Sequence, residues 1–220
     1  MRREHDKISQ TGPDEHTLLL LTGDDFVDHS IYQHTINNSG VTLSTESKYG
    51  VSYRFNGSAM LNVDIGDKRI TDGVFTLEMW LKLDNTLKQY KCVADFCGHD
   101  NFYFDAADSR DGTLILIFTA PNWFPSNGWA HDGSVWLTTS WQHVAIVGDG
   151  THNYIYHNGL RKTGTYYDAF ARQLTMKNGK IRIGNMEYQN LSRYFKGYME
   201  EIRLSNIVRY TDNFTPQSLR

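Results

Sequence analysis

The sequence predicts an all-β protein folded as a sandwich, and three observations support this prediction. Tyr, Phe and Trp are abundant, with 13, 11 and 5 copies among 220 residues, and these side chains favour pleated, half-buried surfaces. Short apolar segments separated by turn signals recur about every ten residues, a spacing typical of sandwiches. No stretch keeps a helical period for more than about two turns. A chain of this length fits one large all-β domain better than two small domains.

The charge and the apolar segments exclude several classes of partner. Lys and Arg total 22 against 25 Asp and Glu, a net charge of −3, so the concentrated basic face that nucleic acid or an anionic membrane requires is not expected. The longest apolar runs, Leu18–Leu21 and Leu114–Phe118, are far shorter than the roughly 20 residues of a membrane span. Residues 1–10 are charged and lack an apolar core, so we expect no signal peptide and no membrane insertion.

The first elements follow from composition and alternation. Residues 1–16 are polar and charged and predict a flexible arm, after which Leu18–Leu21 opens a single domain that spans residues 17–220. Phe75–Lys82 alternates between two faces, which is typical of a strand. One face carries Phe75, Leu77, Met79 and Leu81, and the other carries Thr76, Glu78, Trp80 and Lys82.

Turn signals join the later segments into hairpins. Asp111-Gly112 lies between Asn101–Asp105 and Thr113–Thr119, and Gly148-Asp149-Gly150 lies between Trp141–Val147 and Tyr154–His157. Asn158-Gly159 begins a further hairpin. Trp141–Val147 carries apolar groups on both faces, as expected for a central strand whose second face is partly covered. The remaining predicted strands are Lys180–Gly184 and Gly197–Ser205.

The two cysteines, Cys92 and Cys97, are predicted to be free thiols. On a continuous strand they would lie about 16 Å apart, and a disulfide needs Cα atoms within about 7 Å. Together with His99 they still lack a complete fourfold ligand set, so a zinc site is not expected.

The strand motifs, taken in order, resemble a known family. The matching segments are Phe75–Trp80, Trp141–His143, Tyr154–Gly159, Ile181–Gly184, Tyr194–Asn206 and Arg209–Pro216. This ordered set resembles the laminin-G-like, concanavalin A-like jelly rolls, and in particular the version common in bacteriophage tail-fibre and other virion proteins. The resemblance implies two stacked antiparallel sheets, and a binding or assembly module more often than an enzyme.

The resemblance also implies a cation site. Some members of the family hold a structural calcium ion, and Asp25, Asp28 and Glu200 are the residues expected to bind it here. The family usually has Asp-Glu where this chain has Glu200-Glu201, and this departure counts against Glu200 as a ligand. Apart from calcium, no cofactor is expected.

One aromatic-rich segment, residues 120–133, is expected to be a loop and is the candidate glycan-binding site. Sugars present C–H faces that pack on aromatic rings, and hydroxyls that need amide, carboxylate or imidazole partners. The segment supplies both kinds of group through Asn122, Trp123, Phe124, Asn127, Trp129, His131 and Asp132. The alternative interpretation is that these aromatic side chains fold back and cap the open end of the sandwich.

No arrangement of catalytic residues is evident, so an enzyme is not expected. Glycosidases that share the fold carry paired acidic residues on one strand face, and retaining enzymes need their two carboxyls about 5–5.5 Å apart. Glu200 and Glu201 are adjacent and are expected to point to opposite faces of their strand. Glu201 and Arg203 are expected to pair with Glu78 across strands, which would contribute about 0.2–1 kcal/mol. His143 is expected to be a hydrogen-bonded scaffold residue.

These observations predict a non-catalytic structural and recognition component of a phage-like particle, such as a tail-fibre, tail or capsid-decoration protein. Its expected location is the virion, and its expected partners are other virion proteins, copies of itself and a glycan on the host surface. The arm at residues 1–16 is the expected attachment device. The alternative is a free-standing lectin that binds sugars through residues 120–133, and a glycoside hydrolase or lyase is the third interpretation.

Overall fold

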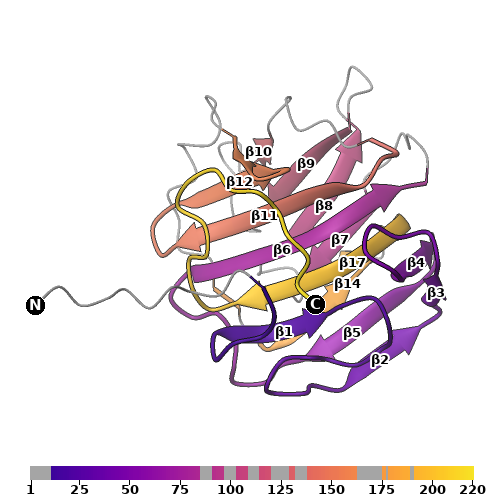
Figure 1. Cartoon of the computed structure of the whole chain (residues 1–220), viewed down its shortest axis with the longest axis horizontal. Helices are drawn as coiled ribbons and strands as arrows, with labels where there is room; N and C mark the ends of the chain where they lie inside the picture. The colour runs from indigo at the N-terminus through magenta and orange to yellow at the C-terminus, as the bar shows by residue number, and fades with distance from the viewer. Residues whose placement is uncertain are drawn as a thin grey trace, which may run out of the picture.

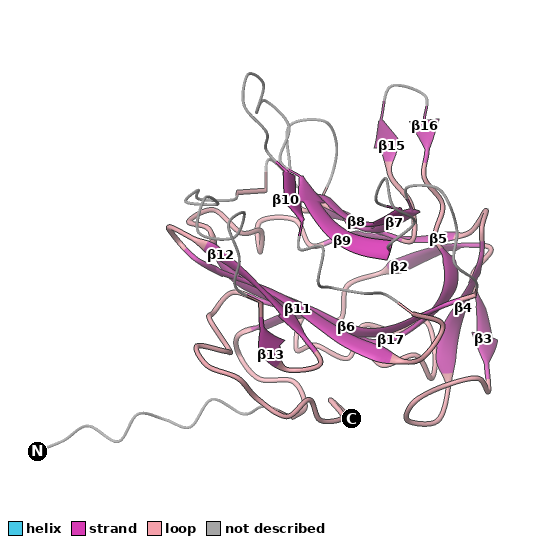
Figure 2. Ribbon diagram, turned by 90° about the horizontal axis from the view of Figure 1, so that it is seen from above, coloured by secondary structure: helices cyan, strands magenta, loops and turns pink. Residues whose placement is uncertain are grey.

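The chain forms two antiparallel sheets stacked face to face (Figures 1 and 2). The computed structural model describes residues 11–84, 91–96, 103–108, 114–119, 129–131, 138–162, 175–176, 178–188 and 191–220. For residues 103–108, 114–119, 129–131, 187–188 and 191–192 the description is confined to the backbone. The described residues form strands and loops without a helix. They include no helix long and apolar enough to cross a membrane. The predicted two-sheet antiparallel sandwich is confirmed.

The first sheet has eight strands in the order β13-β12-β11-β6-β17-β4-β3, and β1 also pairs with β17. These strands are β1 (Thr17–Leu21), β3 (Thr42–Ser44), β4 (Ser52–Asn56), β6 (Val74–Leu83), β11 (Gln142–Asp149), β12 (Asn153–His157), β13 (Leu160–Arg161) and β17 (Lys196–Ser205). The β12–β13 turn has φ angles of 50° at Asn158 and 77° at Gly159. Positive φ at both central residues is what a tight type I′ hairpin requires, so the predicted Asn-Gly turn is confirmed.

The second sheet has seven strands in the order β10-β9-β8-β7-β14-β5-β2. These strands are β2 (Ile36–Ser39), β5 (Met60–Asp64), β7 (Lys91–Asp95), β8 (Tyr103–Asp108), β9 (Leu114–Thr119), β10 (Trp129–His131) and β14 (Lys180–Ile183). A separate two-stranded hairpin consists of β15 (Glu187–Tyr188) and β16 (Leu191–Ser192). Cys92 is buried in β7, whereas Cys97 lies outside the described residues.

The main core fills the space between the sheets and follows the alternation read from the sequence. The eight-stranded sheet contributes Phe75, Leu77, Met79, Leu81, Val144 and Ile146, and the seven-stranded sheet contributes Leu61, Val63, Ile181 and Ile183. The predicted inward face of β6 is therefore confirmed.

Part of the outer face of the eight-stranded sheet is also buried, because residues 206–220, here called the strap, run across it (yellow in Figure 1). The backbone N–H of Phe214 donates to Gly159 O at 2.9 Å, and the amide of Arg209 donates to Thr76 Oγ1 at 3.0 Å. The rings of Tyr210 and Phe214 stack with centroids 3.5 Å apart over a small apolar cluster on β11 and β12. The strap supplies the partial cover that the two apolar faces of β11 predicted.

A polar network lies under the strap, centred on the carboxylate of Glu78. Arg203 donates to Glu78 Oε1 through Nε at 2.8 Å and through Nη2 at 2.6 Å. The hydroxyl of Tyr210 donates to Oε2 at 2.7 Å, and His143 Nε2 lies 3.3 Å from the same oxygen. Burial alone would raise the pKa of Glu78, but the contact with His143 and the charge of Arg203 outweigh it and lower the pKa to about 2.

This network confirms the predicted pairing of Arg203 with Glu78, but breaking the pair costs more stability than the prediction assumed. The prediction assumed an ordinary cross-strand pair, whereas both side chains are at most 1% exposed. A buried pair is costly to break, because the remaining charge has no solvent to stabilise it. The predicted pairing of Glu201 with Glu78 is wrong, since Glu201 contacts the strap instead, through Ser218, Leu219 and Arg220.

The segment before β1 is held against the sandwich. Arg209 binds Asp14 with both terminal nitrogens, at 2.7 Å and 3.0 Å, a bidentate geometry that fixes both side chains. A flexible arm was expected over residues 1–16. Residues 11–16, the described part of that arm, are instead held in place by this contact. Residues 1–10 lie outside the described residues.

Replacing Arg203 by Met is expected to lower the free energy of unfolding by about 3–5 kcal/mol, because it leaves the buried carboxylate of Glu78 without its positive partner. Urea-induced unfolding at neutral pH measures this loss. The double variant Glu78→Gln/Arg203→Met is the control. It removes both charges and should lose less stability than Arg203→Met, so equal losses would contradict the role given to the charge.

The low pKa of Glu78 predicts a loss of stability in acid. The folded protein holds this pKa at about 2, below the ordinary value of 4.5, so the unfolded chain takes up the proton first as the pH falls. The stabilisation from Glu78 is present above about pH 4.5 and is lost as the pH drops towards about 2. Thermal unfolding of wild type and Glu78→Gln across this range measures the effect. Their difference should shrink in acid, and a constant difference would contradict the assignment.

Candidate functional site

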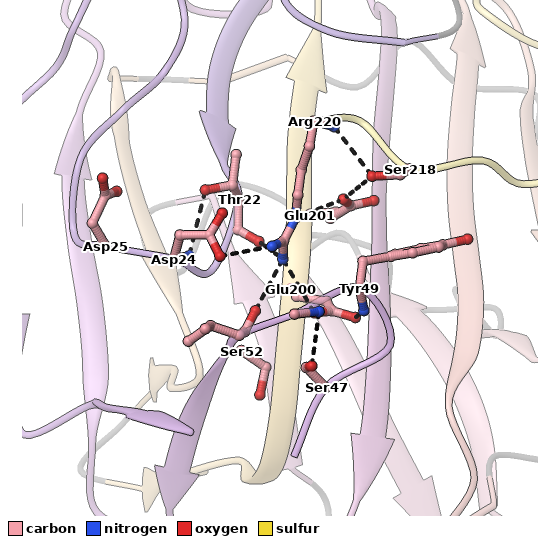
Figure 3. Close-up of polar contacts among 12 residues, drawn as sticks. Thr22, Asp24, Asp25, Ser47, Tyr49, Ser52, Glu200, Glu201, Ser218 and Arg220 are labelled. Carbon is pink, nitrogen blue, oxygen red and sulfur yellow. Dashed lines mark hydrogen bonds and ion pairs between the residues drawn. The ribbon is translucent and has the colours of Figure 1, made fainter. Parts of the chain in front are cut away.

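The described residues bring several acidic groups together where the end of β1 and the β3–β4 loop meet β17, a place here called the corner (Figure 3). Three segments meet there: the turn after β1, the loop between β3 and β4, and the middle of β17. The side chain of Arg220, from the strap, reaches into this corner and lies between the acidic groups (Figure 3). The corner therefore carries its own positive charge.

Five oxygen atoms face the guanidinium of Arg220. They are Asp24 Oδ1 at 2.6 Å, Thr22 O at 3.0 Å, Val51 O at 3.0 Å, Glu201 Oε1 at 3.1 Å and Glu200 Oε2 at 3.4 Å. Nη1 contacts Asp24 and Nε contacts Glu201. Nη2 contacts the remaining three oxygen atoms, those of Thr22, Val51 and Glu200. Every nitrogen of the guanidinium thus has an oxygen partner.

A β-bulge in β17 places Glu200 and Glu201 on the same group. The register between β17 and β6 shifts between Glu200 and Arg203, and Glu201 has a φ of 53°. An extra residue in one strand breaks the alternation of side chains, so both carboxylates reach Arg220. The expectation that these two residues point to opposite faces is wrong for this reason. A left-handed conformation costs a non-glycine residue about 1–3 kcal/mol, which the surrounding contacts must offset.

The two glutamates also fix the chain around them. Glu200 Oε1 accepts the backbone N–H groups of Lys48 at 2.6 Å and Tyr49 at 3.2 Å. Burial raises the pKa of Glu200 to about 7, against the lowering effect of these hydrogen bonds. Glu201 accepts the hydroxyl of Ser218 at 2.6 Å and the N–H of Leu219 at 2.9 Å. Glu200 therefore holds the β3–β4 loop, and Glu201 holds the strap.

The other two predicted cation ligands have different partners. Asp28 is buried and accepts three backbone N–H groups, from Leu20, Ser30 and His34, at 2.9–3.0 Å. Asp25 is more exposed, and its Oδ1 lies 3.0 Å from His29 Nε2. Asp28 thus organises the loop after β1.

The three predicted calcium ligands have protein partners in this structure. Within the described ranges, no group of three or more His, Cys, Asp or Glu residues is arranged to hold a metal. The structure does not bring Asp25, Asp28 and Glu200 together as one ligand set, and the oxygen atoms of Glu200 face Arg220 and two amides. Calcium binding stays an untested prediction.

The aromatic segment predicted to bind glycans is described only in part. Trp129 and His131 lie in β10, which pairs with β9 and forms an edge of the seven-stranded sheet. The last part of the segment, expected to be a loop, therefore includes a short strand. Asn122, Trp123, Phe124, Asn127 and Asp132 lie outside the described residues.

A second aromatic surface lies on the outer face of the eight-stranded sheet. Trp141 and Tyr198 are half-buried, with ring centroids 6.3 Å apart. Trp141 Nε1 donates to Glu46 at 3.2 Å, and the guanidinium of Arg54 lies 4.6 Å from the centre of the Tyr198 ring. Both residues lie in segments that the sequence predicted to be strands, and nothing in the sequence indicated that their rings would be partly exposed.

Comparison with known proteins identifies the fold family. The family model Laminin_G_3, described as the concanavalin A-like lectin/glucanases superfamily, matches residues 56–213. No curated protein sequence gives a significant match.

Several solved structures are similar. One is domain 4 of AbnA, a GH43 extracellular arabinanase from Geobacillus stearothermophilus, in complex with arabinotriose; it has 17% identity and a TM-score of 0.64, over 93% of this chain and 96% of that chain. Another is the binding domain of botulinum neurotoxin serotype D, with 15% identity and a TM-score of 0.64, over 88% and 49%. A third is the ligand binding domain of the same serotype in complex with N-acetylneuraminic acid, with 14% identity and a TM-score of 0.65, over 88% and 48%.

The chain spans about half the length of the toxin domains. Because the sequence identities are only 14–17%, these likenesses establish the fold and nothing beyond it.

Proposed function

We propose that this chain, which belongs to the concanavalin A-like lectin/glucanases superfamily, is a non-catalytic recognition protein that binds a glycan. The observation that carries the proposal is the likeness, over nearly the whole of both chains, to an arabinanase domain solved with arabinotriose. This chain also matches about half of a toxin domain that was solved with N-acetylneuraminic acid.

The positions of the three buried glutamates support binding rather than hydrolysis. Glycoside hydrolysis needs two carboxyl groups that flank the scissile bond. Glu78 is enclosed under the strap, where it binds Arg203. Glu200 and Glu201 are both buried against Arg220. These three carboxyls hold structural partners, so they are unsuited to flank a polysaccharide.

The proposed sugar site is the aromatic segment that ends in β10. Trp129 and His131 lie in an edge strand of the seven-stranded sheet, and the rest of the proposed site comprises Asn122, Trp123, Phe124, Asn127 and Asp132. Aromatic rings beside amide, imidazole and carboxylate groups match the apolar faces and hydroxyls of a sugar.

The double variant Trp123→Ala/Trp129→Ala is expected to weaken glycan binding at least tenfold, because it removes the rings on which a sugar would stack. A glycan array followed by titration with the best ligand measures the loss. Trp141→Ala is the matched control, because it removes a half-buried Trp on the other sheet and should leave binding unchanged. Wild-type protein that binds no glycan, or equal binding by the double variant, would contradict the proposal.

We further propose that the protein is a structural and recognition component of a phage-like particle, with other virion proteins or copies of itself as partners. The support is the ordered set of strand motifs, which resembles virion jelly rolls. Residues 11–16 contact the sandwich through Asp14 and Arg209, so residues 1–10 are the proposed attachment segment. The alternative is a free-standing lectin, which would need no attachment segment.

Deleting residues 1–10 is expected to abolish incorporation into particles while leaving the thermal unfolding midpoint unchanged. Co-sedimentation of the tagged protein with purified particles measures incorporation. The control deletion of residues 1–16 also removes Asp14, so it should lower the midpoint as well. Normal incorporation after deletion of residues 1–10 would argue against this attachment and in favour of the lectin.

A further inference from the structure

The corner around Arg220 joins parts of the chain that are far apart in sequence. The turn after β1 supplies Thr22 and Asp24, the β3–β4 loop supplies Val51, and β17 supplies the two glutamates. All of them converge on one side chain of the strap (Figure 3). The guanidinium therefore ties the strap to three other elements at a single point.

The ligands are of the kind that a hard cation attracts. Carboxylate and backbone carbonyl oxygens are the groups that bind calcium in proteins, and here they surround a guanidinium. Replacing Arg220 by a neutral residue would leave the buried carboxyls of Glu200 and Glu201 facing each other without their positive partner.

The geometry of the corner suits a guanidinium and not a metal ion. Calcium takes oxygen ligands at about 2.3–2.6 Å from one centre. Here the oxygen atoms are distributed over three nitrogens at 2.6–3.4 Å, so they surround a flat, extended group. The absence of a metal-holding group among the described residues agrees with this spacing.

Two glycines show how closely the chain is built around this group. A Cβ on Gly50 would lie 2.9 Å from Arg220 Nη1, and a Cβ on Gly23 would lie 2.7 Å from Val51 O. Both glycines have positive φ angles, 137° and 102°, which other residues rarely adopt. Gly50 therefore lies close against the guanidinium, and Gly23 lies close against Val51 O, one of the oxygen atoms that face it.

We propose that Arg220 is the structural cation of this corner: a guanidinium-shaped site, formed by Thr22, Asp24, Val51, Glu200 and Glu201, is filled from within the chain, so the sandwich closes without calcium. The site is specific for a planar cation with several donors. The contacts of Arg220 with these residues hold the end of the strap in place.

Thermal unfolding with calcium or with EDTA tests the proposal on the full chain. Wild type should show the same midpoint in both, whereas Arg220→Met should unfold at least about 4 °C lower. Arg69→Met, which removes an exposed arginine, is the matched control and should behave as wild type. A wild-type midpoint that rises with calcium, or an Arg220→Met midpoint equal to that of wild type, would overturn the proposal.

A chemical rescue tests the shape of the site. Arg220→Ala leaves room for a small cation, so 10 mM methylguanidinium should raise its midpoint, since a ligand that binds only the folded state stabilises it. Methylammonium and calcium at the same concentration should have no such effect, and wild type should respond to none of the three. Equal rescue by methylammonium or calcium, or no rescue by methylguanidinium, would refute a guanidinium-shaped site.

A conservative variant covers the case in which Arg220→Ala does not fold. Lysine keeps the charge but lacks the planar set of donors, so Arg220→Lys should unfold at a temperature between those of wild type and Arg220→Met. Amide hydrogen exchange in the strap should be faster in Arg220→Lys than in wild type. Unchanged exchange and an unchanged midpoint would show that charge alone suffices and that the site has no preference for guanidinium.

Discussion

The burial of Glu78 and Arg203 on the outer face of the eight-stranded sheet is the constraint on which the rest of the arrangement depends. Two opposite charges that lose contact with water there are stable only if their attraction and further hydrogen bonds offset the lost hydration. The strap covers the pair and supplies one of these hydrogen bonds, from the hydroxyl of Tyr210 to Glu78. The closed strap therefore both buries the pair and completes its hydrogen bonding.

The closed strap decides which surfaces are open to a ligand. Tyr210 and Phe214 lie over β11 and β12, so this part of the eight-stranded sheet faces the protein's own chain. A sugar would have to compete with stacked aromatic rings there. The proposed sugar site lies away from this cover, because β10, which carries part of it, is at an edge of the seven-stranded sheet.

The sequence was a reliable guide where the structure depends on local periodicity. Alternation over Phe75–Lys82 assigned the inward face of β6, and Asn158-Gly159 marked a hairpin that the structure contains. Local periodicity fails at Glu201, because one extra residue in a strand reverses the facing of its neighbours. The contacts of Arg220 carried no sequence signal, since its partners lie up to 198 positions away. The proposed sugar site was suggested by composition alone, and most of it lies outside the described residues.

A cation that is part of the chain and a bound metal ion stabilise the folded protein in different ways. A metal ion must be captured from solution, so its contribution depends on its concentration. Arg220 is delivered by the strap that it closes, so its effective concentration is set by the length of the chain. The strap that brings Arg220 to Glu200 and Glu201 also brings Tyr210 to Glu78. The two buried charge clusters are therefore joined through one segment of the chain.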